Sequence, residues 1–267
     1  MKITIIGSGN MGGAMAKGLA QGSIFQPSDI TCTAQSDATL DKMRAINPEF
    51  NLTHDNLEAS RNADIIIIAV KPWRVESIIE EIKPVLDLES QIILSFAGGV
   101  TFNELNEYLT KGSMQKQQIC PVIFRVIPNT AIEVKSSMTF ISAYNASKEQ
   151  IDFITAMFNE LGSTMLVEER LMAAGTALAS SGIAFALRYV RAAIEGGVEL
   201  GFYPREAQEI VVNTVKGAIN LLLENKSNPE SEIDKVTTPG GITIRGLNEM
   251  ELSGFTSSVI RGLKASR

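Results

Sequence analysis

The 267-residue sequence has few of the residues from which metal sites and disulfide frameworks are built. It contains two cysteines, Cys32 and Cys120, and one histidine, His54. Neither cysteine belongs to a CxxC pair and no cysteine cluster is present, so no metal site is expected. Two isolated cysteines are typical of small buried side chains in a reducing compartment, which favours the cytoplasm.

The sequence also lacks a surplus of positive charge and a long apolar run. Its 24 basic and 30 acidic residues give a formal net charge of −6, which argues against nucleic acid or an anionic membrane surface as the main partner. We expect no membrane span and no signal peptide, because the chain opens on a strand-like segment. With 45% apolar and 20% charged residues, the composition predicts a soluble globular protein of the cytoplasm.

Short apolar runs alternate with helical periodicity in the first part of the chain. Strands are predicted over 2–6, 29–33, 64–70, 91–96, 121–126, 138–143 and 164–167, and helices over 10–21, 39–46, 73–85, 101–108 and 148–161. The isoleucine run 65–68 is typical of a strand buried on both faces, as in parallel sheets. This βαβ rhythm predicts an α/β fold, a doubly wound Rossmann-type sheet over residues 1–167.

The strand-like runs disappear after residue 167. Helices are predicted over 171–200, over 204–225 and from about 244 to the end, with a loop at 225–229. Residues 168–267 therefore form a second, all-helical domain. Because such a small domain, with long apolar faces, is not expected to bury all of its apolar surface, we expect homo-oligomers to form through it.

A glycine fingerprint follows the first predicted strand and opens the first predicted helix. It consists of Gly7, Ser8, Gly9, Asn10, Met11 and Gly12. Gly7 permits the tight turn, Gly9 lets the backbone approach a pyrophosphate, and Gly12 lets helix and strand pack closely. The helix N-terminus then offers N–H groups and a positive dipole end to the anion, so the segment predicts dinucleotide binding.

The end of the second predicted strand bears on which dinucleotide binds. An NAD site usually has an acid about 20 residues past the glycines, bonding the ribose 2′-hydroxyl. This chain has Ala34, Gln35 and Ser36 there, with Asp37 just beyond. Ser36 can bond a phosphate, which favours NADPH. The alternative is that Asp37 reaches back to the ribose and that NADH is preferred.

Other candidate contacts follow the later strands. Lys71, stiffened by Pro72, is either a ligand contact or a solvated loop lysine. The segment 95–99 offers small residues against a nicotinamide. Asn56 is either a contact or only the cap of a short helix.

A second motif, Thr238-Pro239-Gly240-Gly241-Ile242-Thr243, precedes the last predicted helix. Gly240 and Gly241 would expose N–H groups at the helix N-terminus, and the hydroxyls of Thr238 and Thr243 would add donors. This is a nest suited to a substrate carboxylate. The alternative is a capped helix start with Thr243 as N-cap and nothing bound.

These motifs, together with Val70-Lys71-Pro72 and the segment 125–130, resemble the Δ1-pyrroline-5-carboxylate reductases along essentially the whole chain. The TPGGxT segment is the most specific of them. The resemblance implies reduction of L-1-pyrroline-5-carboxylate to L-proline with NADPH or NADH. It also implies a Rossmann domain followed by a helical dimerisation domain, and therefore a homodimer or a higher assembly of dimers.

The resemblance further implies roles for single residues. Thr243 contacts the imine nitrogen, and Thr238, Gly240 and Gly241 hold the carboxylate. The implied cofactor contacts, in addition to the glycine fingerprint and Ser36, are Asn56, Ala69, Val70, Lys71, Pro72, Ala97 and Gly98. The chain departs from the family pattern at Ala131, Ile183 and Arg191, positions that concern helix starts and subunit packing more than the nest.

The reaction needs no strong acid from the protein, because a cyclic imine is basic enough to exist partly as the iminium. The Thr243 hydroxyl is too weak to be an acid and is expected to orient the substrate by a hydrogen bond. His54 is expected on a surface loop, outside catalysis. Two alternatives stay open: a reductase of another cyclic imine or small acid on the same scaffold, and a non-catalytic NADP-binding protein. A hydroxyacid dehydrogenase is disfavoured because 171–200 contains neither lysine nor histidine.

Overall fold

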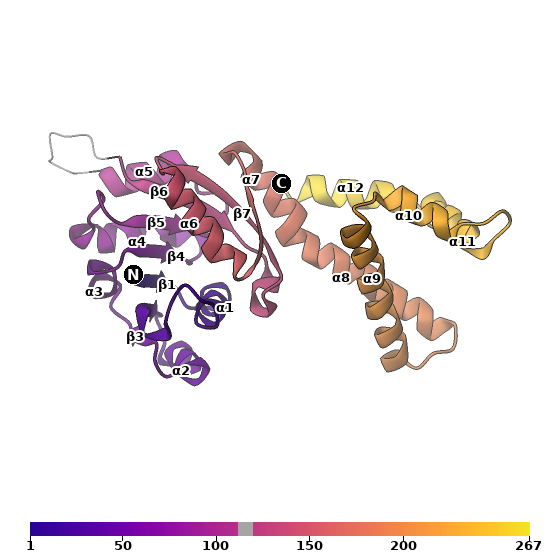
Figure 1. Ribbon diagram of the computed structural model, residues 1–267, viewed down its shortest axis with the longest axis horizontal. Coiled ribbons are helices and arrows are strands. Elements are labelled where there is room, and N and C mark those ends of the chain that lie inside the picture. The colour runs from indigo at the N-terminus through magenta and orange to yellow at the C-terminus, as the bar shows by residue number, and fades with distance from the viewer. Residues whose placement is uncertain (112–119) are drawn as a thin grey trace. The chain divides into compact units, whose positions relative to one another are not determined.

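A computed structural model describes residues 1–111 and 120–267. The chain divides into two compact units, Met1–Ser180 and Ser181–Arg267 (Figure 1). The described residues of the first unit form one eight-stranded sheet of order β3-β2-β1-β4-β5-β6-β7-β8. Its strands are β1 Ile3–Ile6, β2 Ile30–Thr33, β3 Asn51–Thr53, β4 Ile65–Ile68, β5 Ile92–Ser95, β6 Val122–Ile127, β7 Ser137–Tyr144 and β8 Gly162–Leu166. Its α-helices are α1 Asn10–Leu19, α2 Asp37–Ile46, α3 Asn56–Arg61, α4 Val75–Ile82, α5 Phe102–Thr110, α6 Lys148–Asn159 and α7 Met172–Gly175.

The sheet confirms the predicted doubly wound fold and adds two features to it. The short strand β3 was not predicted, because Asn51, Leu52 and Thr53 form too short and polar a run. Every described strand pair is parallel except β6 with β7, which is antiparallel. The reason is the short connection between them, which holds only a 3-10 helix at Thr130–Val134, since a parallel return needs a crossover of a dozen or more residues.

The core lies on both faces of the sheet, as the isoleucine run predicted. Ile65 and Ile67 of β4 pack on one face, in the same cluster as Met15 of α1 and Phe158 of α6. The alternate residues of β4 pack on the other face, in a cluster with α4 and α5. Because both faces are covered, β1 and β4 contain only buried residues, and their positions are rigidly fixed.

The second unit is helical, with α8 Gly182–Glu199, α9 Pro204–Asn225, α10 Pro229–Val236, α11 Ile242–Leu252 and α12 Phe255–Ala265. Residues 204–225 form the helix that was predicted. The predicted helix 171–200 is interrupted by a π-helical turn at Thr176–Ser181, and the last predicted helix is broken at Gly254, whose φ is +80°. The helix α10 was not predicted.

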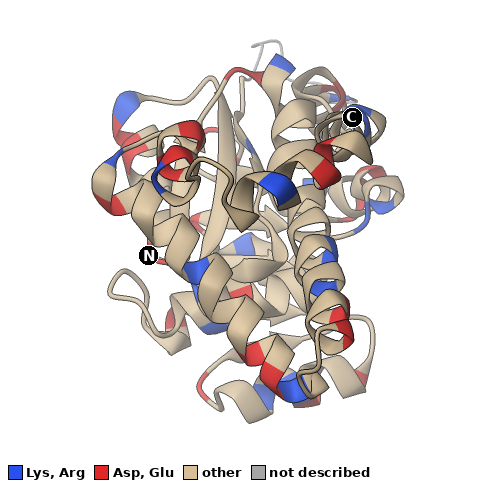
Figure 2. Cartoon of the chain, turned by 90° about the vertical axis from the view of Figure 1, so that its right-hand side faces the viewer, with Lys and Arg blue, Asp and Glu red and all other residues tan. Residues whose placement is uncertain are grey.

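The helices of the second unit leave large apolar side chains exposed. Leu187 of α8 is 61% exposed, Ile219 of α9 51% and Leu252 of α11 83%, whereas Ala207 is buried. Figure 2 shows charged positions spaced along the helices, with uncharged stretches between them. An exposed apolar surface of this extent is typical of an interface with another chain.

One helical run in the described residues bears on the expectation of no membrane span. The helical run Glu169–Glu199 is long and apolar enough to cross a membrane by length and composition alone, with a mean hydropathy of 1.3. The small and apolar residues of its exposed face account for that value. An interface helix and a membrane helix share this composition, so the measure by itself does not separate them.

Candidate functional site

Each of the three fingerprint glycines is required for a different structural reason. Gly7 has φ +96°, and a Cβ there would lie 2.9 Å from Val70 Cγ1. A Cβ at Gly12 would lie 2.4 Å from the carbonyl oxygen of Gly7, so α1 can pack on the turn only with glycine. A Cβ at Gly9 would meet no atom within 4 Å among the described residues. Gly9 therefore borders open space, as the predicted approach of a pyrophosphate requires.

The turn presents the N-terminus of α1 to this open space. Gly9 is the N-cap and has no side chain with which to cap the helix. The N–H groups of Asn10, Met11 and Gly12 lie in the first turn, where no intrahelical acceptor exists, so they and the positive dipole end are available to an anion. This arrangement fits a dinucleotide pyrophosphate.

Ser8 is placed differently from its neighbours. It is buried, and its N–H donates to the Thr33 carbonyl of β2 at 2.9 Å, alongside the N–H of Gly7 at 3.2 Å. These two bonds pin the glycine turn to the end of β2. Ser8 therefore contributes to the shape of the turn, and its N–H is already engaged.

The glycine turn lies at the point where the strand order reverses, because β1 stands between β2 and β4. In open α/β sheets, ligands bind outside the carboxyl ends of the strands at this point. The other predicted cofactor residues also follow the carboxyl ends of parallel strands: Ser36 after β2, Asn56 after β3, Ala69, Val70, Lys71 and Pro72 after β4, and Ala97 and Gly98 after β5. The fold thus brings them to one edge of the sheet.

Asn56 is not a helix cap. The N-cap of α3 is Asp55, whose carboxylate accepts the N–H of Glu58 at 2.9 Å. The Asn56 amide instead accepts a hydrogen bond from Thr33 Oγ1 at 2.6 Å and donates to the carboxylate of Glu81 at 3.1 Å. Asn56 therefore links the end of β2 to α4 at the edge where the cofactor residues gather.

Lys71 occupies the turn after β4. It is the exposed N-cap of a 3-10 helix, Pro72–Arg74, in which Pro72 takes the first position. Pro72 fixes the backbone of this turn, as expected. A Cβ at Gly98, after β5, would meet no atom of the described part of the chain within 4 Å, so the backbone there is also accessible to a ligand.

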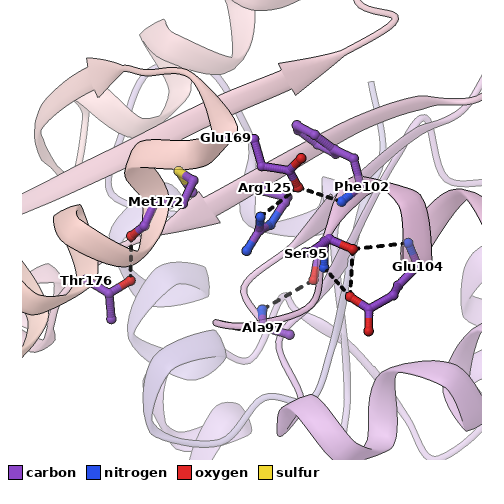
Figure 3. Close-up of polar contacts among 9 residues, drawn as sticks. Ser95, Ala97, Phe102, Glu104, Arg125, Glu169, Met172 and Thr176 are labelled. Carbon is purple, nitrogen blue, oxygen red and sulfur yellow. Dashed lines mark hydrogen bonds and ion pairs between the residues drawn. The ribbon is translucent and has the colours of Figure 1, made fainter. Parts of the chain in front are cut away.

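A partly buried ion pair near these strand ends was missed by the sequence reasoning. Arg125 of β6 donates from Nη1 to Glu169 Oε1 at 2.7 Å, and the same oxygen accepts the N–H of Phe102 at 2.6 Å (Figure 3). The Arg125 side chain is 7% exposed, and its register partner on β5 is Ser95. The pair ties the start of the helical run after β8 to β6 and α5. The sequence could have indicated such a pair, because an arginine inside the apolar strand VIFRVI requires a partner of opposite charge.

In the second unit, the segment 238–243 forms a tight turn that opens α11. The φ of Gly240 is +70°, and the N–H of Gly241 donates to the Thr238 carbonyl at 2.9 Å. A Cβ at Gly241 would lie 2.7 Å from Thr238 Oγ1. Both glycines are therefore required by the turn itself.

Two expectations about this turn need correction. Gly241, not Thr243, is the N-cap of α11, and Thr243 lies in the first turn of the helix. The N–H of Gly241 is engaged in the turn, so the free N–H groups of the first helical turn are those of Ile242, Thr243 and Ile244, which follow the N-cap. The turn still presents a helix N-terminus and the Thr243 hydroxyl, the elements of a carboxylate nest.

Two protein families match the chain in consecutive segments. Residues 2–99 match the family of coenzyme F420-dependent NADP oxidoreductases, and residues 169–267 match the pyrroline-5-carboxylate reductase dimerisation family. Pyrroline-5-carboxylate reductase 2 of Dictyostelium discoideum is 36% identical over 99% of this chain and 90% of its own length. Pyrroline-5-carboxylate reductase 2 of Bacillus subtilis is 31% identical over 97% of this chain and 90% of its own length.

Solved structures are similar over the same length. The Plasmodium falciparum pyrroline carboxylate reductase with NADP bound has a TM-score of 0.87 and 27% identity, covering 100% of this chain and 95% of its own. The pyrroline-5-carboxylate reductase of Coxiella burnetii has a TM-score of 0.87 and 28% identity, covering 99% and 95%.

Proposed function

The chain belongs to the pyrroline-5-carboxylate reductase family, and from this premise we propose which of its residues perform the reaction. The protein is an NADP-dependent oxidoreductase that reduces L-1-pyrroline-5-carboxylate to L-proline. When bound, NADPH supplies the hydride. The similarity over nearly the full length of both chains is the observation that carries this function, because it includes the glycine turn and the segment 238–243 together.

The Rossmann-type unit holds the cofactor in this proposal. The first turn of α1 binds the pyrophosphate through the N–H groups of Asn10, Met11 and Gly12, with Gly9 leaving room for the approach. The residues after β4 and β5, among them Lys71 and Gly98, border the nicotinamide end. The common edge of the strands and the open space before Gly9 support this arrangement.

The turn that opens α11 holds the substrate. The carboxylate lies at the turn formed by Thr238, Gly240 and Gly241 and accepts hydrogen bonds from the free N–H groups that follow the N-cap, beginning with Ile242 and Thr243. The Thr243 hydroxyl oxygen accepts a hydrogen bond from the N–H of the iminium form of the substrate and orients the ring, and this form needs no proton from a side chain. The location of Thr243 in the first turn of α11 supports this assignment.

Replacement of Thr243 tests the role of its hydroxyl. Thr243→Ala should lower kcat/KM about 10–100-fold, the effect of losing a hydrogen bond of about 1.4–2.7 kcal/mol at the reacting nitrogen. Thr243→Ser keeps a hydroxyl and is the matched control, which should retain most of the activity. Equal kinetics for the alanine and serine variants would remove the hydroxyl from the mechanism.

The reaction itself is tested by following NADPH oxidation at 340 nm with pyrroline-5-carboxylate, and repeating the assay with NADH. Substrate-dependent oxidation with formation of proline is the expected result, faster with NADPH. Tight NADPH binding without substrate-dependent oxidation would instead support the non-catalytic alternative.

The dimerisation family match shows that the protein self-associates. We propose a homodimer, or an assembly of dimers, built on the helical residues 168–267, with the cofactor domain at 1–167. The exposed apolar side chains of α8, α9 and α11 support this proposal, as does the start of the dimerisation match at residue 169. Light scattering coupled to size exclusion would reveal a monomer if the proposal were wrong. We propose the cytoplasm as the compartment.

A further inference from the structure

The sole histidine lies at the edge of the sheet where the cofactor residues gather. β2 and β3 pair in parallel with Thr33 opposite Thr53, so His54 and Ala34, the next residues on each strand, lie side by side. His54 Nδ1 is 2.6 Å from the Ala34 carbonyl oxygen, and His54 Nε2 is 2.9 Å from Asp37 Oδ1. The ring therefore bridges the loop between β2 and α2.

This geometry determines the protonation of the ring. A carbonyl oxygen and a carboxylate oxygen both accept hydrogen bonds, so both ring nitrogens of His54 have to donate. Only the imidazolium form carries two N–H groups. The same contacts raise the pKa of His54 above 6.5, through the Ala34 carbonyl first and Asp37 second.

The other acidic groups on the surrounding helices have partners of their own. On α2, Asp41 pairs with Arg44. On α3, the Asp55 carboxylate accepts the N–H of Glu58, whose own carboxylate pairs with Arg61 at 3.3 Å. The charged partner of the imidazolium is therefore Asp37.

The bridge encloses the part of the loop that decides between the two dinucleotides. Gln35 and Ser36 lie between the two anchor points, where a ribose 2′ substituent is recognised in this fold. A free Asp37 could accept the ribose 2′-hydroxyl of NADH and would repel a 2′-phosphate. Bound to His54, the carboxylate is engaged, its charge is compensated, and a positive charge is added beside Ser36.

We propose that His54 is the residue that makes the cofactor site selective for the 2′-phosphate of NADPH, by holding Asp37 as an ion pair. The inference rests on the proposed cofactor site and adds to it a residue outside the glycine turn. The imidazolium acts in two ways. It binds the carboxylate of Asp37, which would otherwise favour NADH, and it contributes positive charge near the N-terminus of α2.

The exposure of the pair limits the size of the effect. The His54 side chain is 50% exposed and that of Asp37 91%, so solvent screens their attraction. We therefore expect a change of about 3–10-fold in selectivity, not the loss of binding. For the same reason the effect should weaken at high salt.

The test uses the full-length protein without a histidine tag and two fragments that differ at the 2′-position. Adenosine 2′,5′-bisphosphate and adenosine 5′-monophosphate are titrated calorimetrically at pH 7 against the wild type, His54→Gln, Asp37→Asn and the double variant. Because His54 is the only histidine, its Hε1 resonance also reports the pKa of the ring directly by NMR.

We expect His54→Gln to reduce the preference for the bisphosphate about 3–10-fold, and the double variant to recover it because no free carboxylate is left. Asp37→Asn should lower the pKa of His54, and the bisphosphate should raise that pKa while the monophosphate does not. The proposal would be overturned, with the cofactor site left intact, if His54→Gln kept the wild-type preference for the bisphosphate. It would also be overturned if the double variant were as unselective as His54→Gln. A wild type that binds neither fragment would overturn the cofactor site, and the inference with it.

Discussion

The clearest quantitative prediction contrasts Gly9 with Gly12, two glycines of one turn. The fingerprint alone gives them similar importance, whereas the structure separates their roles. A methyl group at Gly9 meets no described atom within 4 Å, and the φ of −70° lies outside the left-handed region that favours glycine. A methyl group at Gly12 lies 2.4 Å from a backbone oxygen of Gly7.

The expected stabilities follow from these distances. Gly12→Ala overpacks the turn at a cost of about 2–3 kcal/mol, of which about 1 kcal/mol is offset by the better helix propensity of alanine. At roughly 2–4 °C per kcal/mol for a chain of this size, Tm should fall by roughly 2–8 °C. Gly9→Ala replaces the N-cap glycine by a poorer N-cap residue at a cost of about 0.5 kcal/mol, so Tm should fall by only about 1–2 °C.

The expected effect on NADPH affinity, by contrast, is large for Gly9→Ala. In Gly9→Ala the new methyl group occupies the space in front of the α1 N-terminus, so NADPH should bind about 10–100-fold more weakly, equivalent to about 1.4–2.7 kcal/mol. Thermal unfolding is followed by circular dichroism without cofactor at fixed protein concentration, and NADPH binding by calorimetry. A Gly9→Ala protein that binds NADPH like the wild type, or that is as unstable as Gly12→Ala, would refute the reasoning.

Four further outcomes are expected. Gly241→Val should raise KM for pyrroline-5-carboxylate several-fold with NADPH affinity near normal, and equal damage to both would indicate misfolding instead. Arg125→Met should lower the free energy of unfolding in urea by roughly 2–3 kcal/mol. This is below the usual cost of breaking a buried pair because Glu169 is about a third exposed, and an unchanged unfolding midpoint would contradict it. Leu187→Glu should shift the protein toward monomer in light scattering if α8 lies in the subunit interface. Hydrogen bonds from Thr101 at the helix cap lower the pKa of the Glu104 carboxyl below 4.5. Its contribution to stability is therefore present above pH 4.5 and is lost as the pH falls through the folded pKa. Over that pH range Glu104→Gln should lose less stability than the wild type.

The sequence predicted local structure well where it depends on neighbours along the chain. The glycine turn is one example, because the strand, the turn and the helix are contiguous. The helix predicted to start at residue 101 is another, because the Thr101 hydroxyl at its N-cap accepts the N–H of Glu104, three residues on. The alternative with Thr243 as N-cap was wrong, and it could not be dismissed from the sequence because two glycines and a threonine all suit that position and only the backbone angles distinguish them.

Contacts between distant residues could not be predicted in this way. The sequence suggested that Asp37 lies near the ribose. It did not show that the ring of His54 contacts Asp37, because that contact depends on strand β3, which was not predicted. The pairing of Arg125 with Glu169 likewise requires β6 and the helical run after β8 to meet.

By itself, the sequence determined the fold class and the glycine turn, because local sterics and the period of the apolar residues fix strand, turn and helix one after another. The kind of reaction followed from its resemblance to the pyrroline-5-carboxylate reductases. The tertiary structure decided which candidate groups are free to act. It engages the N–H groups of Ser8 and Gly241, makes Asn56 a link between β2 and α4, and holds Asp37 against His54. A hydrogen bond engages its donor and acceptor wherever they lie in the chain, and only the folded arrangement determines which donor meets which acceptor.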